Sequence, residues 1–490
     1  MIGLYTADEI RAAEAPVLAA GPEGALMQRA ATGLATVCVR LLGAVYGRRV
    51  VLLVGSGNNG GDALFAGTHL ARRGARVTAV LLDPDRAHAT GLAALRGAGG
   101  RVTAAGADRA AADLDRADLV VDGMLGIGGR GGLRAEAAVL ARRAGESAAL
   151  TVAVDVPSGI DADTGAVEEA AFPAMHTVTF GAVKQGLVVG EGRGYAGEIH
   201  LVDIGLAPYL PAPTAFRLTD ADVAARLVPP SSSDDKYSQG VVGVVAGSAT
   251  YPGAAVLCTG AALRTRPGLV RYAGTAADGV RAAWPEAIVT GGRPGDAGRV
   301  QAWVVGPGMG TDGDARSVLA EVLGTDLPVV VDADALTMLA EDPSLVRDRD
   351  APTLLTPHDR EFARFDAEPG PDRVGAAQGL AAALGCAVLL KGEATVVADA
   401  GGTAFVNATG TPWLATAGTG DVLSGIAGAL LAAGLDAAGA GAVAAHLHGR
   451  TGQLAAEQGP LLAGDLVRRL PEAIGRVRGV PARRLGDSEA

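Results

Sequence analysis

The sequence predicts an α/β protein with more than one domain. A chain of 490 residues is too long for one ordinary hydrophobic core. Apolar residues make up 49% of the chain, and many of them are alanine. Glycine is very frequent, and aromatic residues contribute only 3%. Short apolar segments repeatedly run into glycine-rich turns that precede helical patterns, which is typical of parallel sheets covered by helices.

Composition also limits the classes of partner and the compartment. The net charge of −11 argues against a nucleic-acid or anionic-membrane partner. The first residues lack the pattern of a signal peptide, and the apolar run 425–446 contains Asp436, so we expect one buried core helix there and no membrane span. The three cysteines are widely spaced, which favours a reducing, cytoplasmic location, and no spacing typical of a zinc site is present.

The first half opens with a strand, a glycine loop and a helix. An apolar strand at 49–54 is followed by the loop 55–62 and a predicted helix at 63–73. This unit can place a dinucleotide pyrophosphate at a helix start, although the spacing is not GxGxxG. The chain has only three asparagines and three lysines, and two of the asparagines, Asn58 and Asn59, are adjacent in this loop. A tight turn remains an alternative, but ligand binding is the favoured interpretation.

Acidic side chains follow two later strands of the first half. Asp122 and Asp155 each come directly after an apolar segment, and Ser158 lies in the loop after Asp155. The carboxyl ends of parallel strands meet at one edge of a sheet, so we expect these residues and Asn59 to converge on one crevice. Oxygen ligands of this kind suit a hard cation rather than zinc, while a loop cap is the alternative for any single acid. Lys184 is a candidate partner for an anion.

The two halves meet in a proline-rich stretch. Residues 206–230 contain five prolines and precede three consecutive serines, which predicts a stiff connector. We place the boundary near residue 213, giving domains 1–213 and 214–490.

The second half contains the stretch around which the chain is organised, at 416–421. Its glycine-rich turn opens a helix, where unpaired backbone N–H groups and the helix dipole favour an anion. Asp421 would be repelled by a phosphate there, unless it accepts a proton from a hydroxyl that attacks the phosphate. A plain helix cap is the alternative interpretation.

Five motifs of the first half, GSGNNGGD, VDGMLGIGGRGG, AVDVPSGIDADTG, VTFGAVKQGL and LVDIG, resemble in order those of the NAD(P)H-hydrate epimerase domain. The resemblance covers about residues 1–208 and implies a Rossmann-like three-layer α/β/α fold. It implies a potassium ion held by Asn59, Asp122 and Ser158, and an acid–base group at Asp155 that also touches substrate. The remaining implied substrate-binding residues are Asn58, Asn59, Gly60, Gly61, Asp62, Gly126, Ile127, Gly128, Gly129, Arg130, Gly131 and Gly132.

The second half is similar to the ribokinase-like fold, and most closely to the NAD(P)H-hydrate dehydratase domain. KYSQGVVGVVAGSATYPGAA, VVGPGMG, VDADAL, LTPHDREF, LLKGEAT and NATGTPWLATAGTGDVLSG carry this resemblance over about residues 216–480. One departure is Arg360, which replaces the glycine of the usual PHxGE pattern. The implied nucleotide-binding residues are Lys391, Gly392, Glu393, Ala394, Thr395 and Gly420, and the implied substrate contacts are Ala255, Gly308, His358 and the catalytic Asp421.

The resemblance implies a bifunctional repair enzyme, both lyase and isomerase. It would interconvert the R and S hydrates of NADH and NADPH and dehydrate the S epimer, with ADP and magnesium in the second domain. A homo-oligomer is expected. Two rival functions stay open at this point: a small-molecule kinase of the same fold fused to a ligand-binding domain, and a first domain that only senses ligand or dimerises.

Overall fold

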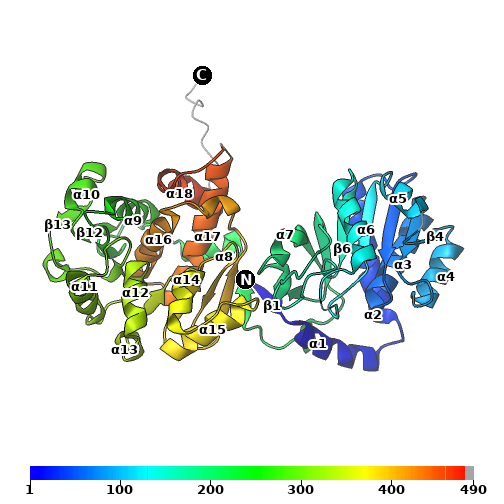
Figure 1. The fold of residues 1–490 in the computed structure, drawn as a ribbon, viewed down its shortest axis with the longest axis horizontal. Helices are drawn as coiled ribbons and strands as arrows, with labels where there is room; N and C mark the ends of the chain where they lie inside the picture. The colour runs from blue at the N-terminus through cyan, green and yellow to red at the C-terminus, as the bar shows by residue number, and fades with distance from the viewer. Residues whose placement is uncertain (107, 130, 267, 458, 480–490) are drawn as a thin grey trace, which may run out of the picture. The chain divides into compact units, whose positions relative to one another are not determined.

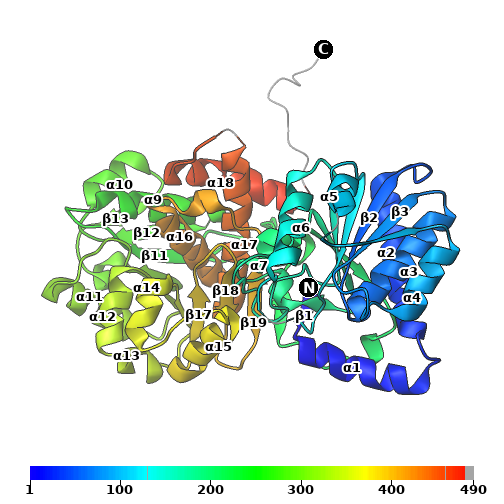
Figure 2. The ribbon, with the colours of Figure 1, turned by 45° about the vertical axis from the view of Figure 1, so that its right-hand side comes forward.

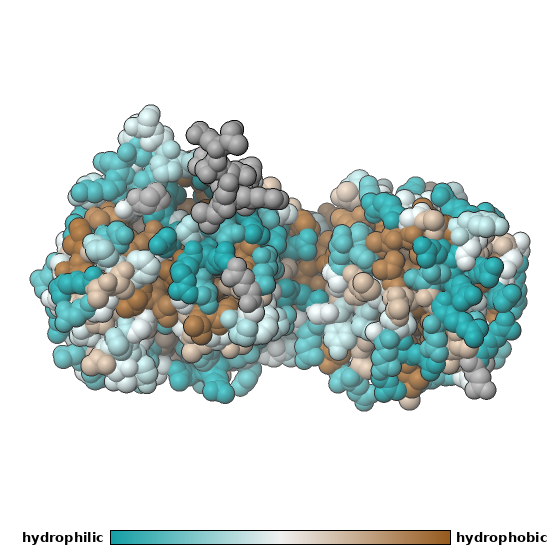
Figure 3. All heavy atoms as spheres, turned by 90° about the horizontal axis from the view of Figure 1, so that it is seen from above, coloured by the Kyte–Doolittle hydropathy of each residue, from teal (hydrophilic) through white to brown (hydrophobic). Residues whose placement is uncertain are grey.

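The computed structural model describes residues 1–479 except 107, 130, 267 and 458. It divides into two compact units, one formed by Gly3–Ala215 and the other by Phe216–Ala490 together with Met1–Ile2. Both units consist of a largely parallel sheet with helices packed on it, so the predicted α/β class is confirmed (Figure 1). Among the described residues, no helix has both the length and the apolar character needed to cross a bilayer. Hydrophilic side chains cover much of each unit's surface in the view of Figure 3.

The first unit contains a seven-stranded parallel sheet in the order β4-β3-β2-β5-β6-β7-β9. Strand residues alternate between two cores: Leu52 of β2 packs in one and Leu53 in the other. Because both faces are buried, the unit has three layers. The strands are β2 (Arg49–Val54), β3 (Arg76–Leu81), β4 (Arg101–Ala104), β5 (Leu119–Gly123), β6 (Leu150–Val154), β7 (His176–Phe180) and β9 (Glu198–Val202).

Helices cover both faces of this sheet. In Figure 2, α5 and α6 lie on one side of β2 and β3, and α2, α3 and α4 lie on the other. Two short elements, β1 (Ile2–Tyr5) and β8 (Val183–Lys184), pair in parallel. The helices are α1 (Ala7–Ala20), α2 (Ala25–Leu42), α3 (Asn58–Arg72), α4 (Ala89–Gly97), α5 (Asp108–Leu114), α6 (Ala135–Glu146) and α7 (Gly192–Ala196).

Helix α3 begins earlier than the sequence pattern predicts, at Asn58 rather than at Ala63. The pattern placed Gly60 and Gly61 in a loop because glycine disfavours helix interiors. In the structure Gly60 packs against the preceding turn, where an added Cβ would lie 2.4 Å from the carbonyl oxygen of Gly55. The glycine is therefore required by a close approach of backbone, and Asn59 and Asp62 are fixed on a rigid helix instead of a loop.

The second unit has a sheet in the order β13-β12-β11-β14-β15-β16-β17-β18-β19, parallel up to β17 and antiparallel beyond it. Helix α16 packs on α9 and on the central strands, and its residues Val422 to Ala432 form much of the core. The strands are β11 (Val241–Val245), β12 (Leu269–Ala273), β13 (Ile288–Thr290), β14 (Ala302–Val305), β15 (Val329–Val331), β16 (Thr353–Leu355), β17 (Ala387–Leu390), β18 (Thr395–Ala398) and β19 (Ala404–Asn407).

The helices of the second unit that follow β11 alternate with its strands or come after the last of them. Each connects one strand to the next or packs on the sheet beside the site. They are α9 (Pro252–Thr265), α10 (Ala277–Ala283), α11 (Gly313–Leu323), α12 (Asp334–Glu341), α13 (Ser344–Arg347), α14 (Asp359–Phe362), α15 (Arg373–Leu384), α16 (Thr419–Ala432), α17 (Ala437–Ala456) and α18 (Ala463–Val477).

The prediction of one core helix across the apolar run 425–446 is wrong. The run is split between α16 and α17, and the turn between them contains Gly434 with φ of 93°. Asp436 caps α17 by accepting a hydrogen bond of 2.7 Å from the backbone N–H of Gly439. A left-handed glycine followed by an Asp cap ends one helix and begins another, whereas the alanine-rich composition on both sides conceals the break.

The proline-rich stretch 206–230 is also more than a connector. It contains β10 (Ala215–Arg217) and α8 (Asp220–Arg226), and Val223 of α8 is fully buried in the core of the second unit. Thr219 and Asp222 form a capping box at the start of α8. This Thr-x-x-Asp pattern indicates the start of a helix, whereas the prolines around it favoured a connector without a helix.

Candidate active sites

In the first unit, the carboxyl ends of β2, β5 and β6 bring together the predicted cation ligands. Asn59 is buried on the first turn of α3 and donates from Nδ2 to the carbonyl oxygen of Leu125 at 2.7 Å. Ser158 Oγ lies 3.2 Å from the same carbonyl oxygen and 2.7 Å from Asp122 Oδ1. Asn59 and Ser158 thus meet at one carbonyl group, Ser158 contacts Asp122, and each of the three predicted residues offers an oxygen atom.

The Asp122 carboxylate is fully buried and is held by neutral donors. It accepts hydrogen bonds from the backbone N–H groups of Ser158 and Met124, at 2.8 and 3.1 Å, and from Ser158 Oγ. Burial raises the pKa of Asp122 to about 6, and the hydrogen bonds from Ser158 and Met124 oppose this shift. No arginine or lysine among the described residues pairs with this carboxylate. A bound cation would supply the missing positive charge.

Asp155 lies at the end of β6 in a strained backbone conformation. Its φ of 66° is in the left-handed region, which non-glycine residues seldom adopt. The carboxylate accepts hydrogen bonds from Lys184 Nζ at 2.5 Å and from the backbone N–H of Phe180 at 3.1 Å. Lys184 is fully buried, so the anion that it faces in this structure is the Asp155 carboxylate. The strain and the ion pair together fix the direction of one carboxylate.

Two further acids face Asp155, and the sequence identified only one of them as a site residue. Oδ1 of Asp62 is buried and has no hydrogen-bond partner among the described residues, and burial raises the pKa of Asp62 well above its usual range. Burial raises the pKa of Glu14 on α1 as well, and the Asp155 charge adds to that shift. Glu14 follows the buried Ile10 by four residues, so an acid on the apolar face of a helix was the available signal.

The glycine loop after β5 lies beside these residues. An added Cβ on Gly126 would approach Asn59 Oδ1 to 3.2 Å, so this glycine allows the loop to contact α3. The carbonyl oxygen of Ile127 accepts a hydrogen bond of 2.8 Å from Arg11 Nη2. Asn58 is exposed at the start of α3. The predicted Arg130 lies outside the described residues.

The second unit contains a cavity of about 800 Å³ beside the N-terminus of α16. Five of the six predicted nucleotide residues line it, together with the predicted substrate residue His358. Ala394 is buried and does not line the cavity, and neither do Ala255, Gly308 and Asp421, although Gly420 beside Asp421 does. Gly308 instead packs against Tyr251 and Ala254 at the start of α9, where an added Cβ would lie 2.9 Å from each side chain. The five lining residues are Lys391, Gly392, Glu393, Thr395 and Gly420.

Lys391 connects this cavity to a buried network that the sequence did not reveal. Its Nζ donates to Asp332 Oδ1 at 2.8 Å and lies 3.6 Å from Glu361 Oε2. Ser424 Oγ donates to the other oxygen of Asp332 at 2.7 Å. Asp332 and Glu361 raise the pKa of Lys391 although its burial acts in the opposite direction. The lysine is therefore a fixed positive charge at the cavity wall.

Asp421 lies in the first turn of α16, close to this network. Burial raises the pKa of Asp421 to about 7, and the negative charges of Asp332 and Asp334 add to the shift, while Lys391 opposes it. The preceding Gly418 has φ of 86°, which turns the chain into the helix. A carboxyl group with a pKa near neutrality at a helix start is suited to accept a proton and release it again.

His358 and Arg360 lie where β16 ends. The ring nitrogen Nδ1 of His358 accepts hydrogen bonds from the backbone N–H groups of Arg360 and Glu361, at 3.1 and 3.2 Å. The Glu361 carboxylate in turn accepts one from the backbone N–H of His358 at 2.9 Å. This capping box forms although Arg360 replaces the expected glycine. Arg360 lines the cavity, so the substitution places a guanidinium group there.

Asn407 and Lys236 are two more of the few asparagines and lysines of this chain, and His448 is a cavity residue that the sequence did not indicate. Asn407 Nδ2 donates to the carbonyl oxygen of Ala445 at 3.0 Å, and its Oδ1 accepts from Thr409. Lys236 lies on an exposed segment. His448 of α17 lines the cavity, and burial lowers its pKa to about 4. The neutral ring can therefore donate from Nε2 to the carbonyl oxygen of Thr419, 2.9 Å away.

The two halves of the chain match two families. The family model described as YjeF-related protein N-terminus matches residues 23–186, and the model described as NAD(P)H-hydrate dehydratase matches residues 242–474. These matches agree with the Rossmann-like and ribokinase-like folds predicted for the two halves.

Full-length relatives carry both halves. A protein of Mycobacterium leprae named bifunctional NAD(P)H-hydrate repair enzyme is 52% identical over 480 residues, covering 97% of this chain and 98% of the relative. A Mycobacterium tuberculosis protein of the same name is 55% identical, covering 88% of this chain and 89% of the relative. Among solved structures, the ADP/ATP-dependent NAD(P)H-hydrate dehydratase of Bacillus subtilis, co-crystallised with ATP and Mg²⁺, is 28% identical with a TM-score of 0.47. It covers 53% of this chain and 98% of that one.

Proposed function

Because the chain belongs to the bifunctional NAD(P)H-hydrate repair enzymes, we propose that Asp155 and Asp421 are the proton-transfer groups of its two activities. The enzyme epimerises the R and S hydrates of NADH and NADPH and dehydrates the S epimer. We assign epimerisation to residues 1–213 and dehydration to 214–490, which the ranges of the two family matches support. The observation that carries the second assignment is the pKa of about 7 of Asp421 beside the cavity.

Dehydration becomes possible when the hydroxyl group of the damaged ring is converted into a better leaving group. The damaged ring carries a hydroxyl group on carbon 6, and hydroxide leaves poorly whereas phosphate leaves well. Asp421 would accept the hydroxyl proton while the oxygen attacks the terminal phosphorus of ADP, which gives a phosphate ester and AMP. Elimination of phosphate and of a ring proton then restores NADH or NADPH. Lys391 and the backbone N–H groups at the start of α16 would stabilise charge on the transferring phosphoryl group.

ADP is the proposed phosphate donor, and magnesium the proposed metal. Magnesium prefers oxygen ligands, and Asp359 and Glu393 line the cavity beside the proposed nucleotide residues, so oxygen donors that suit this ion are present. Arg373 pairs with the Asp359 carboxylate at 2.9 Å, so Asp359 would act through a water ligand of the ion. These residues would hold the ion or its water ligands, and the ion would neutralise charge on the donor phosphates. An absorbance assay tests the proposal: the purified S epimer and ADP should yield NADH, and a stable phosphorylated product would contradict it.

The pH dependence of dehydration should report the ionisation of Asp421. Only the carboxylate can accept a proton, so kcat/KM should fall about tenfold for each pH unit below about 7 and level off above it. The negative charge of Asp332 contributes to the raised pKa, so Asp332→Asn should move this limb to lower pH. A profile that is flat between about pH 5 and 8 would contradict the role of Asp421 as the base.

Epimerisation inverts a carbon that is bonded to both nitrogen and oxygen. Such a carbon loses and regains its configuration through ring opening or loss of the hydroxyl group, with acid–base help. Asp155 is held at the strand end by Lys184 and Phe180, and Asp62 and Glu14 with raised pKa values lie in the same charge cluster. Asp155 would transfer the proton, and the loop 126–132 with residues 58–62 would hold the dinucleotide.

Potassium is the proposed ion of the first site. Asn59, Asp122 and Ser158 offer oxygen atoms around a buried carboxylate that lacks a cationic partner among the described residues, so the donors fit a hard monovalent cation. The ion would supply positive charge near the substrate.

We also propose a cytoplasmic location, because the three cysteines are free and buried. A homo-oligomer stays a prediction that sedimentation of the purified chain would test.

Replacing potassium with lithium should slow epimerisation. We expect a loss of about tenfold, equal to about 1.4 kcal/mol of transition-state stabilisation, and full recovery when potassium is added back. Asp122→Asn removes the buried charge and should make the rate independent of the ion. Dehydration of the pure S epimer by the same samples is the control. Equal epimerisation rates in both salts would contradict the proposed cation site.

A further inference from the structure

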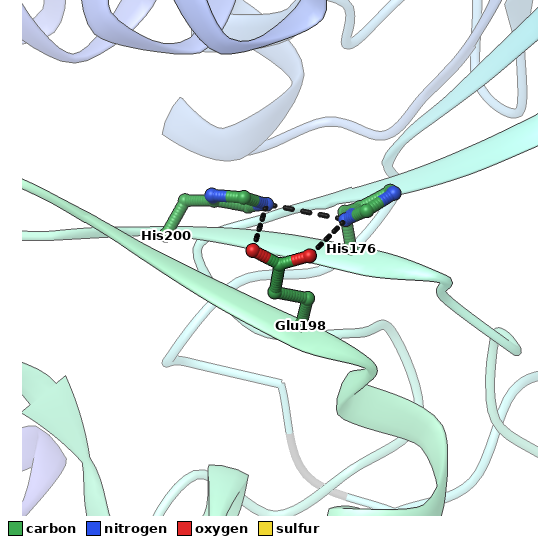
Figure 4. Close-up of side chains that lie close together, drawn as sticks. All are labelled: His176, Glu198 and His200. Atoms are coloured by element: carbon green, nitrogen blue, oxygen red, sulfur yellow. Dashed lines mark hydrogen bonds and ion pairs between the residues drawn. The ribbon is translucent and has the colours of Figure 1, made fainter. Parts of the chain in front are cut away.

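Three potential metal ligands lie together on two paired strands of the first unit, away from the sites described above. His176 begins β7, and Glu198 and His200 lie on β9, which pairs with β7 in parallel. His176 is opposite Glu198 in the register, and residues two apart on a strand share a face. Figure 4 shows the two imidazole rings and the carboxylate directed toward one another.

The distances between the ligand atoms match those of a metal site. Nε2 of His200 lies 3.1 Å from Nδ1 of His176. The Glu198 carboxylate oxygens lie 3.6 Å from Nδ1 of His176 and 3.9 Å from Nε2 of His200. In a tetrahedral zinc site with bonds of about 2.0–2.1 Å, neighbouring ligand atoms are about 3.3 Å apart. Small shifts of the exposed Glu198 would therefore complete a three-ligand set.

The accessibility of the cluster also suits a metal. Glu198 is exposed, with 69% of its side chain accessible, whereas the two histidines are mostly buried. His200 also lines a hollow between α2 and β9 that is open to solvent.

We propose that His176, Glu198 and His200 bind one Zn²⁺ ion, with water as the fourth ligand. Two imidazoles and one carboxylate are a ligand set that zinc accepts, and they exclude the hard cations that require oxygen alone. The cluster contains the first residue of β7, whereas the last residue of that strand, Phe180, donates to the proposed catalytic Asp155. The ion therefore lies at the opposite end of β7 from Asp155, and it ties β9, the last strand in the sheet order, to its neighbour.

Zinc titration of the full chain, prepared free of metal and without a histidine tag, tests the proposal. Calorimetry should show one zinc ion per chain that is lost in His176→Ala, His200→Ala and Glu198→Gln, with affinity lowered at least about tenfold in each variant. Zinc should also raise the Tm of the wild type but not of the three variants. The matched control is His69→Ala, which removes an imidazole from α3 of the same unit and should leave zinc binding unchanged.

Cobalt gives a second readout, because Co²⁺ in a tetrahedral nitrogen and oxygen site absorbs in the visible range. The band should appear with the wild type and His69→Ala and should be absent from the three variants. Epimerisation by the variants should persist, which shows that the unit remains folded. The proposal is overturned if no zinc binds, or if the variants bind zinc as tightly and in the same number as the wild type.

Discussion

Replacing Asp421 with asparagine is expected to lower the rate of dehydration by at least about a hundredfold, the usual scale for a positioned proton acceptor. Asparagine has nearly the same volume but cannot take the proton from the attacking hydroxyl group. Asp421 is suited to this role because burial and the neighbouring Asp332 raise its pKa to about 7 at the start of α16. The measurement is the absorbance of NADH formed from the purified S epimer and ADP.

The same chemical change elsewhere in the unit provides the control. Asp436 caps α17 through its side chain, and asparagine caps helices about as well as aspartate. Asp436→Asn should therefore keep both its stability and its activity. The Asp421→Asn variant should fold as well, since it removes a carboxylate that lies near two others. Near-normal turnover by Asp421→Asn would exclude Asp421 from the mechanism.

The parts of the fold that the sequence predicts are those set by local pattern. Continuous apolar segments such as Arg49–Val54 predicted buried parallel strands, and glycine-rich turns predicted the strand ends at which the site residues lie. Helix boundaries were less predictable. Gly60 and Gly61 favoured a loop, because glycine is unfavourable inside helices. In the structure they lie inside α3, where the close packing of Gly60 on Gly55 requires a glycine. Local propensity and tertiary packing favoured different boundaries, and packing decided.

The missed residues share another cause, because each depends on a partner far along the chain. Asp332 lies 59 residues from Lys391 and 92 residues from Ser424, so no local spacing reveals that network. Glu14 precedes Asp155 by more than a hundred residues. Its only local signal is its place on a buried helix face.

The zinc ligands were hidden in the same way. The zinc patterns that a sequence reveals have ligands close together along the chain, whereas His176 and His200 meet through the pairing of β7 and β9. A Glu-x-His sequence on one strand is too common to indicate a site by itself. The register of the neighbouring strand supplies the third ligand, and register follows from the packing of the whole sheet.

Asp155→Asn is expected to lower epimerisation by at least about a hundredfold while dehydration of the S epimer continues. Asparagine is the informative substitution because it tolerates the left-handed backbone that Asp155 adopts, with φ of 66°. Alanine would add backbone strain to the loss of the carboxylate. With a mixture of epimers and ADP, the wild type should convert the whole sample to NADH. The variant should stop at the fraction that was S at the start, apart from slow spontaneous epimerisation.

A matched control separates the carboxylate from the backbone. Asp366 of the second unit also has a left-handed backbone, with φ of 54°, but its side chain is exposed. Asp366→Asn makes the same chemical change in the same conformation and should convert the whole mixture as the wild type does. If Asp155→Asn also consumed both epimers at the rate of the wild type, proton transfer would have to be assigned to another group. Asp62 and Glu14, the nearby carboxyl groups with raised pKa values, would be the next to replace.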